Sequence, residues 1–592
     1  MLSPAKIKFL DLSLLKRLLK YLRANNGTAL LAVIFMLPAS ILSIIHPLII
    51  KKTIDQNIIN NSMETFRQNI VLFLLILCSS LIFRTLYRYF IEYLGQKIVF
   101  RLRMDILQKI FRLPASYFDR TPDGKTLTNI TNDVESVRKF MSDGILAVAG
   151  ESIKLIVIIT LMLQINSSAA LISFAILPVF AGITLLFRNS IRSGFRSVRA
   201  ANSDINRTMV ESLAGRRENA VFENRRQAAQ KFAGFSNSYR NAFLKVILSY
   251  SFYLPMIDII NIISSIILLG YAHYYINIDI SIGTLFAFSN FMGMFFRPLR
   301  RISERFNTFQ SAMAGSERIF SLLDEKEETY TYARQETALN FNDLPPDIIF
   351  KNVSFSYNKG SSQKIINDLS LHIKAGEKVA IVGPTGAGKT TIIKLLNRLY
   401  ETDSGSILIN GKDIRSINKT RLRSFISTIP QKVFLFNGTV KDNISLFKKE
   451  ITTEKVKKCA LRVKAGAFID ALPGNYDENL LEEGKAISSG QKQLLSFARA
   501  IGEESDILIL DEATANIDTF TEQLIESGMQ PLLKSKTALI IAHRLSTIKN
   551  ADRILVIHKG QLVESGTHAA LIKQNGLYSR LYKMQQLATA ID

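Results

Sequence analysis

The chain has 592 residues, of which 47% are hydrophobic, and its formal net charge is +24. A chain of this length does not fold as one domain, and its two cysteines, Cys78 and Cys459, exclude a disulfide framework. A basic excess is compatible with a nucleic-acid motor, but here the basic residues lie between long apolar runs of the N-terminal half. Cytoplasmic loops of membrane proteins have this arrangement, so we predict a membrane protein with no nucleic-acid partner.

The first segment, Met1–Arg23, is basic and amphipathic. It has no compact apolar core followed by a small-residue cleavage site, so it lacks the pattern of a cleaved signal, and we predict an interfacial elbow helix. Tryptophan is absent from the chain, so tyrosine, lysine and arginine must anchor the protein at the membrane surface.

Six apolar stretches follow, each long enough to cross a hydrocarbon core as a helix. They are Thr28–Ile49, Ile70–Tyr93, Leu146–Ile165, Ser168–Phe187, Val246–Tyr274 and Ile282–Phe296. Only Asn166 and Ser167 separate the third from the fourth, which predicts a tight turn. The connections after the second and fourth stretches are long, basic and helix-patterned, so we expect those helices to continue into the cytosol. The even number of spans puts both termini in the cytoplasm.

Charged residues also lie in or beside these apolar runs, where they are costly and usually face a cavity or one another. They are Arg84, Arg88, Glu151, Lys154 and Asp258. Glu151 and Lys154 are three residues apart, which favours an intrahelical pair. Asp258 has no such neighbour and is the better cavity candidate. The phenylalanines and methionines of Phe288–Phe296 suit either helix packing or a greasy translocation path.

From Ile348 onward the pattern changes to short β-rich runs with helical segments between them. The predicted strands are Ile348–Val353, Lys378–Val382, Ser406–Ile409, Ile507–Leu510, Ala538–Ala542 and Arg553–His558. We therefore predict an α-helical six-span transmembrane domain over residues 1–324, a linker over 325–346, and an α/β P-loop ATPase domain over 347–592.

A complete phosphate-binding loop follows the second of these strands. It consists of Gly383, Pro384, Thr385, Gly386, Ala387, Gly388, Lys389 and Thr390, and Thr391 comes next in the helix. Closely spaced glycines let backbone N–H groups converge on a phosphate at a helix N-terminus. Lys389 is then expected to reach the β- and γ-phosphates of ATP, and the Thr390 hydroxyl to ligate Mg²⁺.

Single residues before and after the loop also occupy positions that suit ATP chemistry. Tyr357 precedes the loop and is placed to stack on adenine. Asp511 ends an apolar strand, where it can hold Mg²⁺, and Glu512 beside it can polarise the attacking water. Gln431 is expected to touch the metal and a neighbouring domain. His543, after another apolar strand, is expected to hold the γ-phosphate.

The order of these motifs resembles that of ABC transporter ATPases. Tyr357, Gly383–Thr390, Gln431, Ser488–Gln491, Asp511-Glu512, Ala515–Asp518 and His543 look like the A-loop, Walker A, Q-loop, signature, Walker B, D-loop and H-loop. The N-terminal half resembles the six-helix exporter type through Phe118-Asp119, Gly124, Asn132-Asp133 and Gln310–Leu323. The resemblance covers nearly the whole chain, and the signature region is diagnostic because other phosphate-loop enzymes lack it.

The resemblance implies a half-transporter in a bacterial cell membrane that pairs with a second half-transporter and exports drugs or lipids. ATP and Mg²⁺ would lie between the Walker A motif of one chain and the signature of the other. The ATP-contacting set would then include Ser488, Ser489, Gly490, Gln491 and Asp518. Coupling helices are expected near Thr121–Leu127 and Gly215–Glu223. A homodimeric lipid flippase or a peptide exporter is the alternative.

The chain departs from the family at Ser489, where the usual Leu-Ser-Gly-Gly-Gln signature has a glycine. A Cβ there is expected to narrow the allowed backbone and to crowd the approach to the phosphate, although serine is small and can itself donate a hydrogen bond. An altered signature together with an intact Glu512 fits one subunit of a heterodimer, and a homodimer remains open. The D-loop Ala515–Asp518 also departs from the commoner sequence, without favouring either form.

Overall fold

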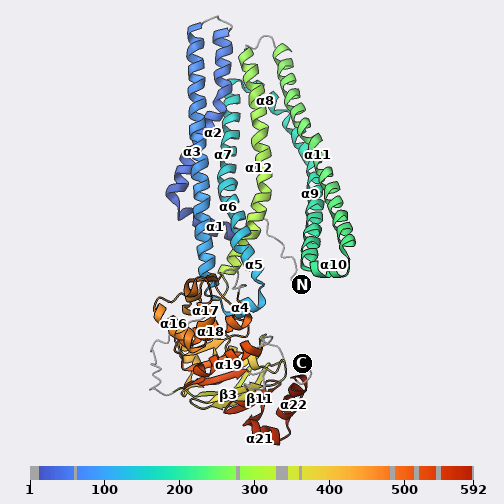
Figure 1. Cartoon of the computed structure of the whole chain (residues 1–592). Coiled ribbons are helices and arrows are strands. Elements are labelled where there is room, and N and C mark those ends of the chain that lie inside the picture. Colours follow the sequence, from blue (N-terminus) through green and yellow to red (C-terminus); the bar gives the residue numbers. More distant parts are fainter. Residues whose placement is uncertain are drawn as a thin grey trace. The chain divides into compact units, whose positions relative to one another are not determined.

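The computed structural model describes residues 12–58, 63–274, 281–328, 345–358, 363–480, 487–511, 519–541 and 548–589 (Figure 1). The chain forms two compact units. The first consists of Met1–Phe111 and Gly124–Glu325, and the second of Arg112–Asp123 and Lys326–Asp592. A short segment from the N-terminal half of the chain thus belongs to the second unit. The boundaries of the predicted linker at 325–346 stay a prediction, because most of it lies outside the described residues.

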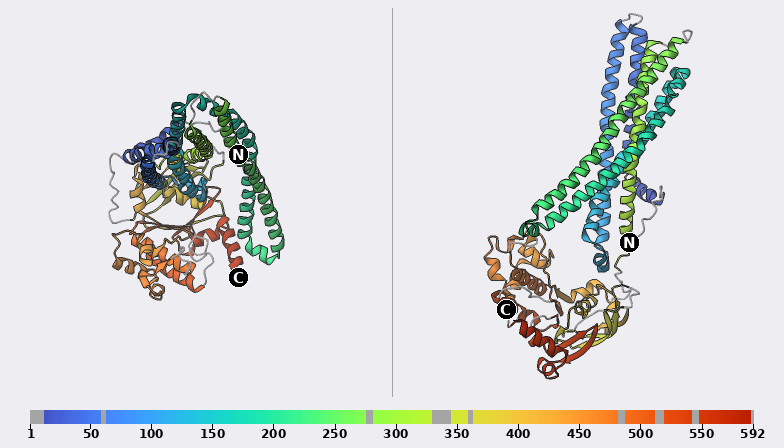
Figure 2. Two further views of the ribbon diagram at one scale, coloured as in Figure 1. Left: turned by 90° about the horizontal axis from the view of Figure 1, so that it is seen from above. Right: turned by 90° about the vertical axis from the view of Figure 1, so that its right-hand side faces the viewer.

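The first unit is helical. Its elements are α1 (Leu12–Arg23), α2 (Asn26–Thr53), η1 (Ile54–Ile58), α3 (Met63–Ile110), α5 (Asp123–Thr128), η2 (Asn129–Asp133), α6 (Val134–Phe140), η3 (Met141–Ile145), α7 (Leu146–Ile165), α8 (Ser167–Phe174), α9 (Leu177–Ala214), α10 (Arg216–Val221), α11 (Arg225–Tyr274) and α12 (Ile282–Leu323). α2 runs beside α3, and α9 runs beside α11 with the short α10 at the tip of the hairpin (Figure 1). The hairpin diverges from α3 and α12 toward that tip, both in Figure 1 and in the right-hand view of Figure 2.

Among the described residues, five helices are long and apolar enough to cross a membrane. They cover Asn26–Asn57, Glu64–Ile110, Leu146–Ile165, Ser167–Ala214 and Arg225–Tyr271. The first four predicted spans lie within them, and the fifth, Val246–Tyr274, overlaps the last helix up to Tyr271. The sixth, Ile282–Phe296, is not among the five, because α12 begins only at Ile282 and Arg297 soon interrupts its apolar part. That span stays a prediction.

The turn predicted between the third and fourth spans is confirmed and is even shorter than expected. α7 ends at Ile165, and Asn166 alone separates it from α8. The Asn166 side chain accepts a hydrogen bond from the backbone N–H of Ala169 at 2.9 Å, which caps α8. The fourth span is not one continuous helix: it is interrupted at Ala175, and α9 restarts with Pro178 in its first turn, where proline is tolerated.

The core of the first unit gathers around α12. Its Phe288, Phe291, Met292, Phe295 and Phe296 are all buried, and they pack with residues of α2, α7, α9 and α11. Of the two roles considered for Phe288–Phe296, helix packing is therefore the one these side chains have within the chain.

The second unit is an α/β domain. Its strands are β1 (Ile348–Phe355), β2 (Ile366–Ile373), β3 (Lys378–Val382), β4 (Ser404–Ile409), β5 (Lys412–Asp413), β6 (Ile426–Ile429), β7 (Gly438–Thr439), β8 (Asn479–Leu480), β9 (Ile507–Asp511), β10 (Thr537–Ile541), β11 (Arg553–His558) and β12 (Gln561–Gly566). Its helices are α4 (Ala115–Arg120), α13 (Lys389–Leu396), α14 (Lys419–Ser424), α15 (Val440–Ser445), α16 (Thr453–Arg462), α17 (Gly466–Asp470), α18 (Ser489–Gly502), α19 (Thr519–Leu533), α21 (His568–Lys573) and α22 (Leu577–Thr589).

The six-stranded sheet of this unit has the order β12-β11-β3-β10-β9-β6. Its five inner and edge strands from β11 to β6 are mutually parallel, and β12 is antiparallel. β3, β9 and β10 are buried along nearly their whole length, as expected for parallel strands covered on both faces. A second, antiparallel sheet has the order β2-β1-β4-β5. Parallel strands bring their carboxyl ends to one edge, and that edge carries the candidate site.

Candidate functional site

The phosphate loop connects β3 to α13, and its backbone depends on glycine. Gly386 has φ of +80° and Gly388 has φ of +103°, a left-handed region that residues with a side chain rarely adopt. Gly388 directly precedes α13, so the free N–H groups of the first helical turn face the inside of the loop. The predicted loop is therefore built as an anion-binding turn at a helix N-terminus.

Lys389 places its ammonium group within this loop. The side chain is only 8% exposed as a residue, and its Nζ donates hydrogen bonds to the carbonyl oxygens of Gly383 at 2.6 Å and Pro384 at 3.1 Å. The loop therefore holds a buried positive charge at its centre, which favours the binding of an anion there. Thr390, the next residue, is exposed at the start of α13, so its hydroxyl is accessible to a metal ion. These groups fit a nucleotide phosphate with a hard divalent cation.

Tyr357 lies beside the first turn of α13. Its hydroxyl is 3.1 Å from the Thr391 hydroxyl in the first turn of α13. Its ring meets Phe355 edge-on at 5.0 Å and Tyr400 at 5.1 Å between ring centroids. The residue remains 40% exposed, so its ring is braced by two aromatic side chains and still accessible to a planar base.

The metal-ligand candidates come from neighbouring strands at the carboxyl edge of the large sheet. Asp511 is the last residue of β9 and pairs in register with Ile541 of β10, which pairs with Ile381 of β3. Gln431 follows β6, the strand on the other side of β9. The sheet thus aligns the phosphate loop, Asp511 and Gln431 along one edge, where ligands of parallel α/β sheets bind.

Several predicted residues fall outside the described part of the chain. They are Glu512, the D-loop residues Ala515–Asp518, and His543. In the sequence, Glu512 directly follows Asp511, the last residue of β9, and His543 comes two residues after Ile541, the last residue of β10.

The signature residues form the start of α18. Ser488 Oγ accepts from the N–H of Gln491 at 3.2 Å, and Gln491 Oε1 accepts from the N–H of Ser488 at 2.9 Å, which is a reciprocal capping box. Ser489 is the first residue of the helix, is exposed, and is not among the residues with positive φ. The narrower backbone range of serine therefore brings no strain at this position, because serine adopts helical φ freely. Crowding of the phosphate approach stays a prediction.

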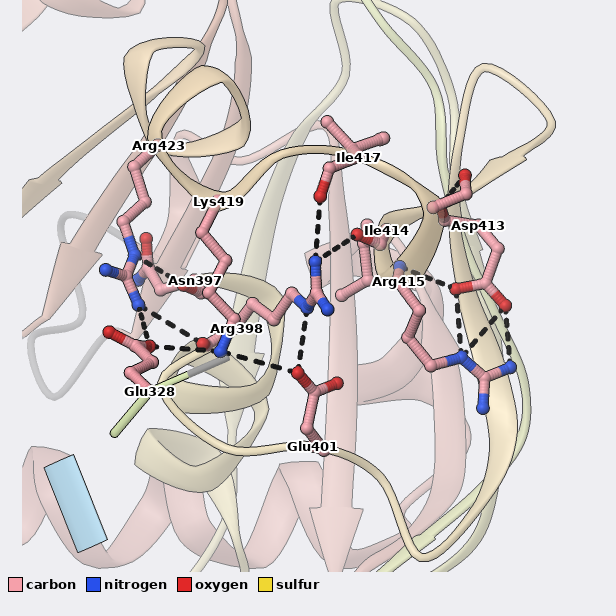
Figure 3. Close-up of polar contacts among 11 residues, drawn as sticks. Glu328, Asn397, Arg398, Glu401, Asp413, Ile414, Arg415, Ile417, Lys419 and Arg423 are labelled. Carbon is pink, nitrogen blue, oxygen red and sulfur yellow. Dashed lines mark hydrogen bonds and ion pairs between the residues drawn. The ribbon is translucent and has the colours of Figure 1, made fainter. Parts of the chain in front are cut away.

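A charged cluster that the sequence analysis missed lies beside α13 (Figure 3). Glu328 Oε1 accepts from Lys419 Nζ at 3.0 Å and from Arg423 Nη2 at 2.9 Å, and its side chain is 10% exposed. Burial acts to raise the pKa of Glu328, but the hydrogen bonds from Arg423 and Lys419 outweigh it and hold this pKa below its usual value. The carboxylate therefore stays charged at neutral pH.

Arg398 forms the centre of the same cluster. It follows α13 by two residues, is buried, and donates from Nη1 to the carbonyl oxygens of Ile414 at 3.1 Å and Ile417 at 2.8 Å. Its Nε donates to Glu401 at 2.9 Å (Figure 3). Glu328, Lys419 and Arg398 are far apart in sequence and no motif joins them, so no sequence signal was available to find the cluster.

Tyr400 connects the base-stacking candidate to α4. Its hydroxyl donates a short hydrogen bond to Asp119, and Lys394 Nζ lies 3.4 Å from the same carboxylate. Lys394 Nζ also lies over the rings of Tyr357 and Tyr400, at 5.4 and 5.7 Å from their centroids. A chain of contacts thus runs from Tyr357 to Asp119, which the resemblance had assigned to an intracellular element. Sequence reasoning did not identify Tyr400 or Lys394.

In the helical unit, the predicted pair of Glu151 and Lys154 is confirmed at 3.1 Å. A partner on α12 was missed: Arg301 Nη1 lies 2.8 Å from the same Glu151 oxygen. Asp258 on α11 is exposed in the single chain, and its place in a cavity stays a prediction. Arg84 and Arg88 of α3 are exposed as well.

Comparisons with known proteins agree with both units. Residues 29–299 match the family model described as ABC transporter transmembrane region, and residues 366–515 match the model described as ABC transporter. A third model, IstB-like ATP binding protein, matches residues 300–398, a stretch that contains the phosphate loop.

Whole-length relatives are also found. The chain is 34% identical over 584 residues to the uncharacterized ABC transporter ATP-binding protein YfiC of Bacillus subtilis, covering 96% of this chain and 94% of the relative. It is 34% identical over 506 residues to the ATP-dependent lipid A-core flippase of Desulfotalea psychrophila, covering 84% and 86%. The solved structure of a bacterial Atm1-family ABC exporter with ATP bound is similar with a TM-score of 0.76 at 26% identity, covering 94% of this chain and 99% of that one.

Proposed function

We propose that two half-transporters make the working unit of this protein, since the chain belongs to the ABC transporter family and is a half-transporter of the exporter type. It is a multi-pass membrane protein whose ATP hydrolysis drives transport. The substrate that we propose is a hydrophobic or amphipathic molecule, a lipid or a drug, and the relative named as a lipid flippase supports the lipid. We place the protein in a bacterial cell membrane with both termini in the cytoplasm.

The main support for the dimer is the exposed apolar surface of the α9–α11 hairpin. At its tip, Val221 is 75% exposed and Phe222 is 78% exposed. Along its shaft, large apolar side chains are also exposed, among them Val210, Leu213, Leu244, Leu248 and Phe252. Burying apolar surface is favourable at about 25 cal/mol per Å², so a second chain that covers the tip stabilises the assembly. We propose that α5 and α10 are the coupling helices.

For the chemistry, we propose that the loop N–H groups, Lys389 and the first turn of α13 bind the phosphates, while Tyr357 stacks on adenine. Thr390, Gln431 and Asp511 would hold Mg²⁺, which when bound neutralises phosphate charge. Glu512 would orient and polarise the attacking water, and His543 would hold the γ-phosphate.

The partner's signature would complete each site. The start of α18 offers free N–H groups and the positive end of a helix dipole to the γ-phosphate of the other chain. Asp518 would contact that same nucleotide from the D-loop. Since Ser489 departs from the usual signature and Glu512 is present, we propose a heterodimer in which this chain supplies the catalytic glutamate to the competent site.

The proposal is tested with Glu512→Gln in the purified transporter. The amide keeps the size and polarity of the side chain but cannot polarise water, so ATP binding should persist while turnover falls by about 100-fold or more. Turnover like that of the unchanged protein would refute the role of Glu512. Robust, transport-coupled turnover of this chain purified alone would refute the heterodimer and leave the homodimer.

A further inference from the structure

A row of arginines runs along one face of α9. Arg188, Arg192, Arg196 and Arg199 are spaced by four, four and three residues, and all four are exposed. At about 100° per residue they fall within about 80° of one another around the helix. We call these four side chains the arginine face.

The arginine face points away from α11. α9 packs on α11 through Gly194, whose Cβ position would lie 2.7 Å from Val246, and through the hydroxyls of Ser190 and Ser249 at 3.1 Å. At about 100° per residue, Ser190 and Gly194 lie on the side of α9 about 160° from the mean direction of the arginines. The face is therefore free of intrachain packing on the hairpin.

Acidic residues are missing from this part of the hairpin. The stretch from Arg188 to Ser203 on α9 contains no aspartate or glutamate, and neither does the stretch from Ser236 to Ile257 on α11. That part of α11 adds two more exposed cations, Arg240 and Lys245. Within the described part of the chain, none of the six forms an ion pair.

Some other cations of the same unit do have acidic partners. Arg138 contacts Glu92 and Glu135 at 2.7 Å, and Arg318 contacts Asp133 at 2.5 Å. Even on α9, farther toward the tip, Arg207 contacts Asp204 at 2.8 Å. Other stretches of the unit also lack acids, such as the one that holds Arg84 and Arg88 of α3, so what distinguishes this stretch is a row of four exposed arginines on one helix face. Like charges at i, i+4 on a helix destabilise it, so the arrangement favours an external anion.

The arginine face begins where the apolar part of the helix ends. Ser167–Ala214 is one of the five candidate membrane-spanning stretches, and its apolar part leads directly to Arg188. Leu185, three residues before Arg188 and on the same side of the helix, is 59% exposed. An apolar surface followed at once by arginines matches a molecule that has acyl chains and an anionic head group.

We propose that the arginine face binds the phosphate head group of an anionic lipid drawn from the membrane, while the adjoining apolar part of α9 contacts its acyl chains. Guanidinium groups bind phosphate oxygens in pairs, and adjacent arginines on the face are one helical turn, about 5.4 Å, apart. Two neighbouring arginines can therefore hold one phosphate. The proposal rests on the proposed export function and narrows its substrate to anionic amphiphiles.

The test uses the full transporter in detergent, titrated with phosphatidylglycerol and, in parallel, with phosphatidylcholine of the same chains. Binding is followed through a fluorescent label on the lipid. The double variant Arg192→Gln/Arg196→Gln should weaken phosphatidylglycerol binding about tenfold and leave phosphatidylcholine binding unchanged. Arg192→Lys/Arg196→Lys should retain an intermediate affinity, because lysine keeps the charge but not the paired geometry.

Arg207→Gln is the matched control, since it removes the same charge from the same helix at a position that has an acidic partner. It should leave lipid binding and ATP turnover unchanged. Competition with inorganic phosphate distinguishes a lipid from a free anion: millimolar phosphate should not displace the lipid, because it lacks acyl chains.

Four outcomes would overturn the proposal. They are an unchanged phosphatidylglycerol affinity in the double variant, an equal loss for phosphatidylcholine, an equal loss in Arg207→Gln, and full displacement by inorganic phosphate. Dissociation of the dimer in the double variant, measured by its mass in solution, would show instead that the arginines pair with acids of the second chain. The Glu512→Gln assay tests the proposed ATP-driven export independently of the lipid site. If the transporter hydrolyses ATP normally but shows no preference for an anionic lipid, only the proposed lipid site is refuted.

Discussion

Two regions of the helical unit differ in where their apolar and charged side chains find partners. Around α12, apolar side chains such as Phe288 and Phe291 are buried and charged groups such as Asp133 and Arg318 are paired within the chain. In the α9–α11 hairpin, Phe222 and the arginine face are exposed without such partners. The first region is complete within one chain, whereas the second gains its contacts from other molecules. Substitutions in the first should therefore change stability, and substitutions in the second should change association and transport.

The largest effect is expected for Asp133→Asn. The Asp133 side chain is 4% exposed and holds Arg318 through two hydrogen bonds, from Nε at 2.8 Å and from Nη2 at 2.5 Å. Breaking a buried pair from one side costs about 3–5 kcal/mol, and because Arg318 is 49% exposed the lower end of this range applies. The thermal midpoint, followed by circular dichroism of the helices, should therefore fall by about 6 °C. Arg207→Gln, which breaks an exposed pair in the hairpin, should shift it by about 2 °C at most. Equal shifts of the thermal midpoint in the two variants would contradict the contrast between the α12 region and the hairpin.

Lys389→Ala extends the comparison to the phosphate loop, a second region that is complete within the chain. It removes the buried ammonium group that the carbonyl oxygens of Gly383 and Pro384 hold in place. ATP affinity should fall about 100-fold, since a charge-assisted contact contributes about 3 kcal/mol. Equilibrium binding of a fluorescent ATP analogue to the intact transporter measures this. Unchanged affinity would remove Lys389 from the site.

Glu328→Gln should destabilise the nucleotide-binding unit by about 2 kcal/mol at pH 7, since it weakens two buried charge-assisted hydrogen bonds. A thiol-reactive dye reports the unfolding through buried Cys459, once exposed Cys78 is replaced by serine. Because the pKa of Glu328 is lowered in the folded protein, its contribution is fully present above the unfolded pKa of about 4.3.

That contribution is lost as the pH falls through the lowered pKa of the folded state. The difference between Glu328→Gln and the unchanged protein should therefore be constant from pH 6 to 8 and shrink below about pH 4. A difference that grows on acidification would contradict the assigned pairing with Lys419 and Arg423.

Phe222→Asp addresses the hairpin tip. A charge on an apolar contact surface should weaken docking to a second chain by about 1.4 kcal/mol or more, a tenfold loss of transport into vesicles, while ATP binding persists. Phe222→Leu, which stays apolar, serves as the control and should transport nearly as well as the unchanged protein. A marked loss of thermal stability in Phe222→Asp would mean that the tip is packed within its own chain after all.

The smallest effect is expected for Ser489→Gly. In a heterodimer this signature closes over the weaker ATP site, so the turnover of the pair should change by less than about threefold. In a homodimer Ser489 lies in both sites, and the same change should alter turnover substantially. ATP hydrolysis by the purified pair distinguishes the two.

Local patterns in the sequence were sufficient for much of the fold and the phosphate site. β3 and β11 have the predicted bounds, and the spacing of the glycines within eight residues was enough to predict a phosphate-binding loop. β2, β6 and β12 were missed, because polar residues interrupt their apolar patterns. The break in the fourth span was missed for the opposite reason: Ala175 is as apolar as its neighbours, so no polar residue marks the turn.

Long-range pairs could not be predicted. Glu328 meets Lys419 and Arg423 across 91 and 95 residues, and Arg301 meets Glu151 across 150. Neither end of these pairs differs in sequence from an ordinary surface residue. Which cation is paired and which is left for a ligand is decided by the fold, as the contrast between Arg207 and Arg192 on one helix illustrates.

The placement of α4 has a consequence for how the protein responds to cleavage. Because Arg112–Asp123 belongs to the nucleotide-binding unit, the polypeptide crosses between the units at residues 111–112, 123–124 and 325–326. A single protease cut within 329–344 would fall inside the second unit, leaving Arg112–Asp123 and Lys326–Glu328 on the first fragment and the rest of that unit on the second. Glu328 on the first fragment would still pair with Lys419 and Arg423 on the second, and Asp119 on the first would still hold Lys394 on the second. The nicked protein should therefore migrate as two fragments in denaturing gels and as one particle in native buffer.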